Sequence, residues 1–252
     1  SIIMININLV KTNFINSLKS KMSQDEIKSI WDTWVLCEIL NLTKLECIID
    51  QNINVNSFNA SKINDLISHL LANNHIQYFF GYSYFKNLKI TLDSNVLIPR
   101  IETEELVDLV LSKTNKKGFN CIDIGTGSGC IAILLKKKLK FNMYAVDFSQ
   151  DILNRAKINA KNHNVNIHFK LLNILNFDKY DLLPNFDFIV SNPPYVLKSE
   201  VSLDSNVHEE PTTSIFVKQD DPLVFYKAIC VFAQKKLKKS GIMFFEINPL
   251  FH

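Results

Sequence analysis

A glycine-rich segment in the middle of the chain is the first candidate for a ligand site. It follows an apolar run and reads Asp123-Ile-Gly125-Thr-Gly127-Ser-Gly129-Cys130. Its glycines let the backbone turn sharply off a strand and allow a ligand to approach the main chain closely. A helix expected to start at Cys130 would add free N–H groups. The segment therefore predicts a ligand-binding turn, with a purely structural glycine turn as the alternative.

The spacing of these glycines favours one ligand over another. A dinucleotide site requires G-x-G-x-x-G, but Gly129 comes one residue early and Cys130 stands in the third glycine position. The pattern D-x-G-x-G-x-G instead suits S-adenosylmethionine, which has no pyrophosphate. We expect Asp123 to pair with the ammonium group of this cofactor. The cofactor contacts expected in the turn are Gly125, Thr126, Gly127, Ser128 and Gly129.

An acidic residue follows the next apolar run. Asp147 comes directly after Tyr144-Ala-Val146, about twenty residues beyond the glycines, where a carboxylate can accept hydrogen bonds from two ribose hydroxyls. A helix N-cap is the alternative role for this residue. Because Asp147 follows the strand after the glycine turn at the expected spacing, it is expected to contact the ribose.

The most informative segment reads Asn192-Pro193-Pro194-Tyr195 and follows another apolar run. Its two prolines remove two N–H donors, so nearby carbonyl groups are left as unshared acceptors. Together with the Asn192 side-chain carbonyl, they can hold both hydrogens of a planar NH2 group, against which Tyr195 can pack. When both hydrogens are held in this way, the lone pair of the nitrogen can point toward a methyl sulfonium. These four residues are the expected catalytic group, and an ordinary Pro-Pro turn is the alternative.

An alternating pattern of strands and helices predicts the scaffold that positions these segments. Strands are expected at 121–124, 143–146, 167–172, 186–191 and 241–247, and helices at 103–111, 130–138, 150–162 and 222–236. Such alternation is typical of a parallel sheet covered by helices on both faces, an α/β Rossmann-like fold. Ligands bind at the carboxyl ends of such strands, where all three segments lie.

The first hundred residues predict two further parts. Residues 1–75 have apolar positions at helical spacing, with a helix over 61–71 that Ser61 would cap, and predict a small helical bundle. Residues 76–100 change to short alternating stretches at 78–81, 84–90 and 96–99, which predict a β-hairpin linker. The expected domains are therefore 1–75, 76–100 and 101–252.

Composition excludes several classes of protein. The 252 residues are 47% hydrophobic, which excludes a disordered chain, and the expected apolar runs are shorter than the ~20 residues of a membrane-spanning helix. A net charge of +3 gives no strong attraction for nucleic acid, so no stable nucleic-acid binding is expected. The five cysteines contain no C-x-x-C pair, and the histidines form no cluster. We therefore expect no metal site and a cytoplasmic protein without a signal peptide.

The sequence resembles the PrmC/HemK family, the glutamine-N5 methyltransferases of peptide chain release factors. The resemblance covers residues 77–247 and rests on Asp123 to Ile133, Asn192-Pro-Pro-Tyr195, Glu210-Pro-Thr-Thr and Asp221-Pro-Leu-Val-Phe-Tyr226. The run Val96-Leu-Ile-Pro-Arg100-Ile-Glu102-Thr-Glu104 singles out this family. Its members usually have V-L-I-P-R-P-E-T-E here, so Ile101 replaces a proline. The Asn-Pro-Pro-Tyr element alone also occurs in adenine-N6 methyltransferases.

This resemblance implies a substrate, a cofactor and their contacts. The substrate would be the glutamine in the Gly-Gly-Gln loop of a class I release factor, bound by Asn192 to Tyr195 together with Arg100 and Glu102. S-adenosylmethionine would lie at the glycine turn, Asp147 and Asn192. Asn173 stands where the family has an acid that recognises the adenine amino group, so weaker cofactor binding is expected. Ile174 would line the adenine pocket, and residues 1–75 would dock the substrate of a monomeric enzyme.

Two rival functions stay open. The first is N-methylation of an exocyclic amine of a nucleobase in rRNA, tRNA or DNA, which the same pocket could serve. The second is a degenerate or truncated chain that binds cofactor without turnover, suggested by Asn173 and by the C-terminus. The chain stops at His252, whereas the family fold continues with a helix and an edge hairpin. Ile242-Met-Phe-Phe245 would then form an exposed apolar edge.

Overall fold

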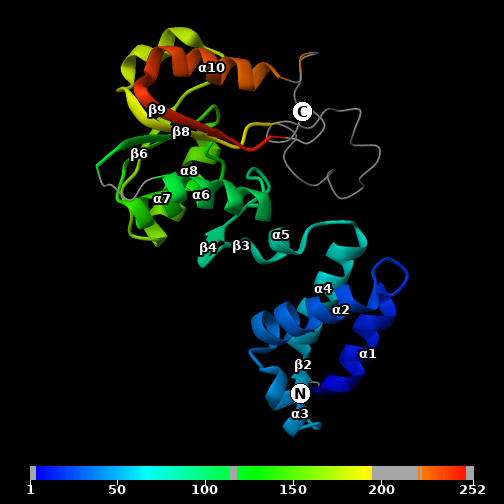
Figure 1. Cartoon of the computed structure of the whole chain (residues 1–252). Coiled ribbons are helices and arrows are strands. Elements are labelled where there is room, and N and C mark those ends of the chain that lie inside the picture. The colour runs from blue at the N-terminus through cyan, green and yellow to red at the C-terminus, as the bar shows by residue number, and fades with distance from the viewer. Residues whose placement is uncertain (1–3, 114–117, 195–220, 222, 248–252) are drawn as a thin grey trace. The chain divides into compact units, whose positions relative to one another are not determined.

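A computed structural model of the chain describes residues 4–113, 118–194, 221 and 223–247. The chain forms two compact units, Ser1–Phe79 and Phe80–His252 (Figure 1). Tyr195 and the run Glu210-Pro-Thr-Thr, on which the family resemblance partly rests, lie outside the described residues.

The first unit is built mainly of helices. Its short strands β1 (Met4–Asn6) and β2 (Asn54–Asn56) pair in an antiparallel arrangement. Its helices are α1 (Ile7–Leu18), α2 (Gln24–Ile30), the π-helix η1 (Trp31–Leu40), α3 (Lys44–Ile49) and α4 (Ser57–Leu71). Phe14 and Trp31 are almost fully buried in the core of this unit, and their ring centroids lie 5.4 Å apart. The helical bundle expected from the spacing of apolar residues is present.

Side-chain caps set where these helices begin. Ser23 with Glu26, and Thr43 with Glu46, form reciprocal hydrogen bonds that satisfy free N–H groups at the starts of α2 and α3. The expected start of α4 at Ser61 is wrong, because the side chain of Asn56 accepts a hydrogen bond of 2.8 Å from the Asn59 N–H. This cap starts the helix one turn earlier.

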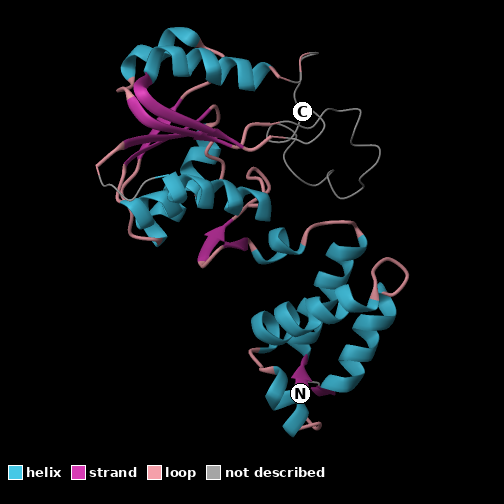
Figure 2. Ribbon diagram, in the orientation of Figure 1, coloured by secondary structure: helices cyan, strands magenta, loops and turns pink. Residues whose placement is uncertain are grey.

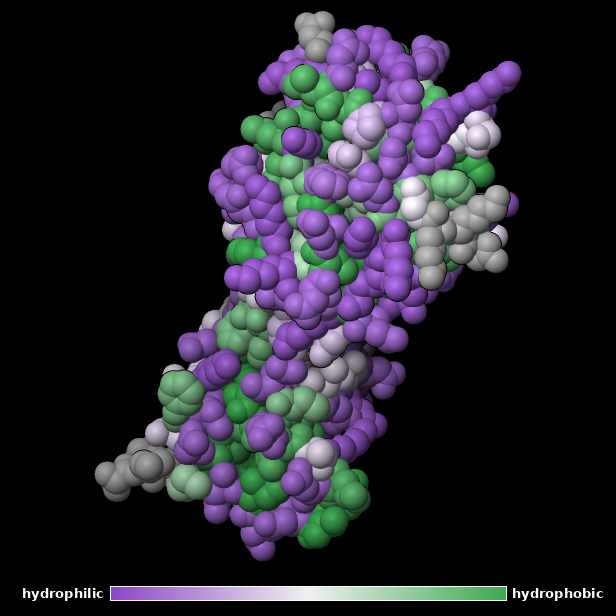
Figure 3. All heavy atoms as spheres, turned by 90° about the vertical axis from the view of Figure 1, so that its left-hand side faces the viewer, coloured by the Kyte–Doolittle hydropathy of each residue, from purple (hydrophilic) through white to green (hydrophobic). Residues whose placement is uncertain are grey.

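Helix α3 buries none of its residues. Its side chains Leu45, Ile48 and Ile49 are 63%, 66% and 75% exposed. Figure 3 shows hydrophobic residues at the surface at the lower end of this unit, the end at which Figure 1 places α3. The first unit thus carries an exposed apolar surface, called here the α3 face and defined by these three residues.

The second unit begins with an antiparallel hairpin. Helix α5 (Ile76–Phe80) leads into β3 (Tyr82–Phe85) and β4 (Leu88–Thr91), which pair with each other. The strand expected at 78–81 is wrong, because the chain makes one turn of helix there before Gly81, at φ 74°, redirects it into β3. The strand expected at 96–99 is also absent, since these described residues pair with no other strand.

A parallel sheet organises the rest of this unit. Within the described residues its strands are β5 (Asn120–Ile124), β6 (Asn142–Asp147), β7 (His168–Leu171), β8 (Phe186–Ser191) and β9 (Leu237–Phe245). They lie in the order β7-β6-β5-β8-β9, and all neighbours are parallel. The predicted α/β Rossmann-like fold is confirmed.

Helices cover both faces of this sheet (Figure 2). One face carries α6 (Ile101–Lys113), α7 (Cys130–Leu139) and α8 (Gln150–Asn162). The other carries α10 (Val224–Lys236) and the 3-10 helix η2 (Phe177–Leu182). Because side chains alternate along a strand, Ile122 and Ile124 pack toward Phe232 of α10, whereas Asp123 points to the opposite face.

Strand β9 is the last strand at one side of the described sheet. Ile242 is 40% exposed, but Phe244 is buried and its ring lies 6.1 Å from that of Phe188 on β8. The expected apolar edge is therefore only partly exposed, because alternate side chains of β9 pack inside the unit.

Candidate active site

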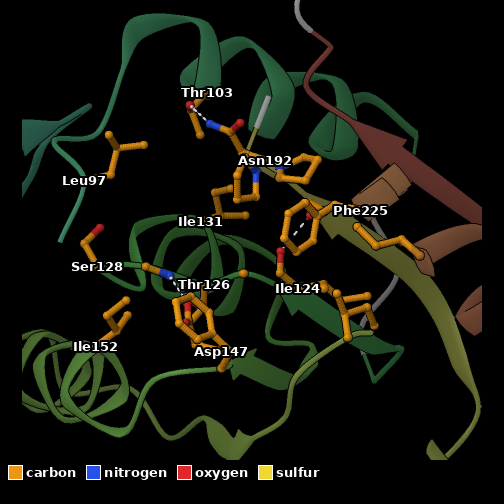
Figure 4. Close-up of a pocket in the computed structure, with 18 of the residues that line it drawn as sticks. Leu97, Thr103, Ile124, Thr126, Ser128, Ile131, Asp147, Ile152, Asn192 and Phe225 are labelled. Atoms are coloured by element: carbon orange, nitrogen blue, oxygen red, sulfur yellow. Dashed lines mark hydrogen bonds between the residues drawn. The ribbon is translucent and has the colours of Figure 1, made fainter. Parts of the chain in front are cut away.

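A pocket of about 340 Å³ opens at the carboxyl edge of the parallel sheet. The ends of β5, β6 and β8 contribute Ile124, Asp147 and Ser191 to its lining. The Ser191 hydroxyl donates a hydrogen bond of 2.7 Å to the Ile124 carbonyl, which fixes the end of β8 against the end of β5. Figure 4 shows Thr103 and Asn192 on one side of this pocket and Asp147 and Ile152 on the other. Its volume is that of a small-molecule site.

Gly125 and Gly127 of the glycine turn line the pocket with backbone atoms alone. Gly125 and Gly127 have positive φ angles of 73° and 54°, and a Cβ built on either would meet no atom within 4 Å. Their backbone therefore borders open space that a ligand can occupy. Gly129 differs, because its Cβ would lie 3.2 Å from the Ala156 Cβ on α8. This glycine allows helix packing and does not line the pocket.

Asp123 lies fully buried beneath the turn. Its Oδ2 accepts a hydrogen bond of 2.7 Å from the Thr126 hydroxyl, whereas its Oδ1 is buried and accepts none from the described residues. Burial raises the pKa of this carboxyl to about 7; the Thr126 hydrogen bond opposes the rise and the Asp147 charge adds to it. The free oxygen fits the need of a ligand cation, although Asp123 does not itself line the pocket.

Asp147 ends β6 at the opposite wall of the pocket from Asn192 (Figure 4). It is only 5% exposed, and its Oδ1 accepts a hydrogen bond of 3.3 Å from the Ser149 N–H. Burial raises the pKa of Asp147, while hydrogen bonds from backbone N–H groups, that of Gly127 first, oppose the rise. The carboxylate is thus oriented by backbone donors in a place where it can accept further bonds from a ligand.

Asn192 directly follows β8 and is held by helix α6. Its Nδ2 donates a hydrogen bond of 3.0 Å to the Thr103 hydroxyl, as Figure 4 shows. Its Oδ1 is buried and accepts no hydrogen bond from the described residues. A buried acceptor without a donor costs free energy, about 1–3 kcal/mol for a typical group. The Asn192 amide therefore has one occupied end and one available end.

Apolar side chains complete the pocket. Phe148 and Ile152 follow Asp147, Leu172 and Ile174 follow β7, and Phe225 comes from the start of α10. The exposed Asn173 also lines this part, and its Oδ1 accepts a hydrogen bond of 3.0 Å from the Leu175 N–H. Such walls suit the flat, uncharged part of a nucleoside.

The side chain of Asn159 braces the glycine turn from behind. This fully buried residue of α8 donates hydrogen bonds of 2.9 Å to the Ser128 carbonyl and 3.0 Å to the Thr91 carbonyl. Its Oδ1 accepts from the Thr91 N–H at 2.9 Å. Strand β4 of the hairpin and the glycine turn are thus joined through one amide.

Comparisons with known proteins agree with this geometry. A family model described as a methyltransferase domain matches residues 115–245. The release factor glutamine methyltransferase of Flavobacterium psychrophilum is 36% identical over 246 residues, an alignment that covers 94% of this chain and 85% of the relative. The enzyme of the same name from Bacteroides thetaiotaomicron is 34% identical and is aligned over 93% of this chain and 84% of its own length. The chain belongs to the release factor glutamine methyltransferase family. The resemblance inferred from the sequence is confirmed.

Most residues expected to bind cofactor or substrate meet at this pocket of the methyltransferase. The lining includes the predicted residues Arg100, Gly125, Thr126, Gly127, Ser128, Asp147, Asn173, Ile174, Asn192, Pro193 and Pro194. Glu102 lies in the first turn of α6, is exposed and does not line the pocket. Tyr195 lies outside the described residues. The individual roles of these residues stay predictions.

The sequence interpretation missed one polar residue that lines the pocket, Thr103, and its hydrogen-bond partner Glu246. The sequence analysis includes Thr103 only within the run 96–104 that resembles the family, and Glu246 only within the strand expected at 241–247. In the structure, the Thr103 hydroxyl lies 2.6 Å from Oε2 of Glu246. Burial raises the pKa of Glu246, and the hydrogen bond from Thr103 opposes the rise. No local signal reveals such a pair, because its members are 143 residues apart.

In the described part of the chain, no three His, Cys, Asp or Glu side chains are grouped in a way that could hold a metal ion. Among the same residues, no helix is long and apolar enough to cross a membrane.

Proposed function

We propose that this chain methylates the side-chain amide nitrogen, N5, of the glutamine in the Gly-Gly-Gln loop of class I peptide chain release factors. Its membership of the family supports the reaction. The single observation that carries the proposal is the shared pocket, which places the glycine turn and Asn192-Pro193-Pro194 at one edge of the sheet.

S-adenosylmethionine is the proposed methyl donor, and the residues present fit it. The open backbone of Gly125 and Gly127 would hold its amino-acid moiety, and Asp147 would accept from its ribose hydroxyls. The buried Oδ1 of Asp123, which accepts no hydrogen bond from the described residues, would be the partner of its ammonium group. When bound, this cofactor supplies a methyl group on a positively charged sulfur, which a nitrogen lone pair can attack.

The protein's part in the reaction is to hold and orient the amide. An amide nitrogen is a poor nucleophile, because its lone pair is delocalised into the carbonyl group. The free Oδ1 of Asn192 can accept a hydrogen bond from the substrate N–H. Pro193 and Pro194 contribute no N–H groups that would compete for the neighbouring carbonyls. An acceptor fixed in this way stabilises the positive charge that develops on nitrogen.

The first unit is proposed to dock the release factor. The α3 face supports this role, because Leu45, Ile48 and Ile49 expose apolar surface that their own unit does not cover. A protein partner would gain free energy by covering such side chains.

Mass spectrometry of a recombinant class I release factor tests the proposed activity. After incubation with the chain and S-adenosylmethionine, we expect one added methyl group on the glutamine of the Gly-Gly-Gln loop. Parallel incubations with rRNA, tRNA and DNA test the rival substrates. Methylation of a nucleobase with no change in the release factor would reject the proposal in favour of an exocyclic amine. Cofactor binding without any transfer would instead support a chain that has lost turnover.

A further inference from the structure

A chain of two hydrogen bonds connects Asn192 to a carboxylate outside the pocket. The Asn192 Nδ2 donates to the Thr103 hydroxyl at 3.0 Å, and this hydroxyl donates to Glu246 Oε2 at 2.6 Å. The three residues come from different elements, since Thr103 belongs to α6, Asn192 follows β8 and Glu246 follows β9. Thr103 lines the pocket, whereas Glu246 lies behind it.

The direction of these two hydrogen bonds decides which end of the Asn192 amide stays available. A threonine hydroxyl has one hydrogen to donate and two lone pairs that accept, and an ionised carboxylate only accepts. The Thr103 hydrogen is therefore given to Glu246, and the Thr103 oxygen faces Asn192 as an acceptor. An acceptor at this place requires the NH2 end of Asn192. A reversed amide would bring its oxygen against a lone pair of Thr103.

Burial holds Thr103 in place, and backbone contacts hold Glu246. Thr103 is 3% exposed within α6. The Glu246 N–H donates to the Ser191 carbonyl at 3.1 Å, next to Asn192, and the Tyr226 hydroxyl donates to the Glu246 carbonyl at 3.0 Å. The backbone of Glu246 is thus tied to Ser191, the last residue of β8, which directly precedes Asn192.

We propose that Thr103 and Glu246 are positioning residues for methyl transfer, an inference that rests on the proposed function. They hold the NH2 end of Asn192 so that its buried oxygen, which accepts no bond from the described residues, is presented to the N–H of the substrate glutamine. Neither residue has to touch the reacting atoms. Their contribution is to orient an acceptor before the substrate arrives, which spares the cost of orienting it during the reaction.

Substitution of Thr103 by residues of similar size tests the proposal. Thr103→Val removes the hydroxyl but keeps the shape, and Thr103→Ser keeps the hydroxyl. We expect Thr103→Val to lower kcat for release-factor methylation ~10-fold or more, with KM for the release factor changed less than about threefold. Thr103→Ser should restore kcat to within about threefold of the wild type. Ser112→Ala is the control, because it removes an exposed hydroxyl from the same helix.

A second measurement does not depend on activity. The side-chain NH2 signal of Asn192 can be assigned in a ¹⁵N spectrum by its loss in Asn192→Ala. We expect Thr103→Val and Glu246→Gln to shift this signal, and Thr103→Ser and Ser112→Ala to leave it in place. Glu246→Gln keeps the size of the side chain and carries the test if Thr103→Val does not fold.

The outcomes separate this inference from the proposed function. A wild-type chain that methylates no release factor rejects the proposed function, while the NH2 signal still decides whether Thr103 and Glu246 hold Asn192. An active wild type together with a Thr103→Val variant of unchanged kcat and unchanged NH2 signal overturns the inference alone. If Glu246→Gln changes neither kcat nor the NH2 signal of Asn192, the role of Glu246 is rejected.

Discussion

The backbone N–H of Gly127 donates a hydrogen bond of 3.1 Å to the Oδ2 of Asp147. This contact joins the glycine turn after β5 to the end of the neighbouring strand β6. The acid expected to bind the ribose therefore also holds the turn expected to bind the rest of the cofactor. Loss of its side chain should affect both.

Asp147→Ala should weaken binding of S-adenosylmethionine. The variant removes an acceptor for the ribose and frees the Gly127 N–H. We expect a loss of ~1–3 kcal/mol in the free energy of cofactor binding, the range for a charged acceptor. Isothermal titration calorimetry measures the change directly. Asp151→Ala is a matched control, since Asp151 is an exposed acid in the first turn of α8. An Asp147→Ala variant with the affinity of the wild type would remove Asp147 from the cofactor site.

Asn192→Ala should separate binding from chemistry. The variant keeps the glycine turn and Asp147, so its affinity for the cofactor should stay within about twofold of the wild type. It loses the acceptor proposed for the substrate N–H, and methyl transfer should fall ~100-fold, as when one oriented hydrogen-bonding group is removed from an active site. Radiolabelled methyl transfer to the release factor gives the rate. Transfer within a few-fold of the wild type would disprove the role of the amide.

The buried carboxyl of Asp123 predicts how stability varies with pH. Burial, the largest cause, raises its pKa in the folded chain from 3.8 to about 7. Between these values the folded chain binds a proton that the unfolded chain has released. The contribution of Asp123 to the free energy of unfolding is therefore full below pH 3.8 and decreases as the pH rises toward 7.

Urea unfolding of the wild type and of Asp123→Asn at several pH values checks this dependence. The amide that this substitution introduces cannot titrate, so the free energy of unfolding of the wild type minus that of the variant should fall by roughly 2–4 kcal/mol from pH 4 to pH 7.5. Other groups titrate in both chains and largely cancel in the difference. A difference that stays constant over this range would mean that Asp123 is ionised throughout.

Asn159→Ala should destabilise the second unit. The substitution leaves the buried Ser128 carbonyl and the two part-buried backbone groups of Thr91 without their partner. At ~1–3 kcal/mol for each unsatisfied buried group, we expect a loss of about 3 kcal/mol or more. Asn154→Ala, which changes an exposed asparagine of the same helix, should cost less than about 0.5 kcal/mol. Equal thermal stability of the two variants would show that the brace contributes little.

The α3 face predicts an effect on substrate binding alone. Ile48→Ser combined with Ile49→Ser removes exposed apolar surface from the first unit. We expect KM for the release factor to rise ~5-fold or more, with kcat and cofactor affinity unchanged. Leu182→Ser is the control, because it removes an 87% exposed apolar side chain from the second unit. A KM equal to that of the control would place the docking surface elsewhere.

The sequence came closest to the structure where the pattern is local. The helix at 150–162 and the strand at 186–191 have the bounds of α8 and β8. The sequence interpretation failed where local preference and tertiary context disagree. The aromatic residues at 78–80 favour a strand by propensity, yet they form the helical turn α5 ahead of the hairpin.

The sequence by itself determined the α/β fold and most of the pocket. Periods of 2 and 3.6 residues identify strands and helices, and parallel strands bring their carboxyl ends, with the segments that follow them, to one edge. Only the tertiary structure decided how Asn192 is held. Thr103 is 89 residues from Asn192 and 143 from Glu246, and the order of the strands in the sheet brings the three together. A hydrogen bond depends on the distance and direction between atoms in space, which a periodic pattern along the chain does not specify.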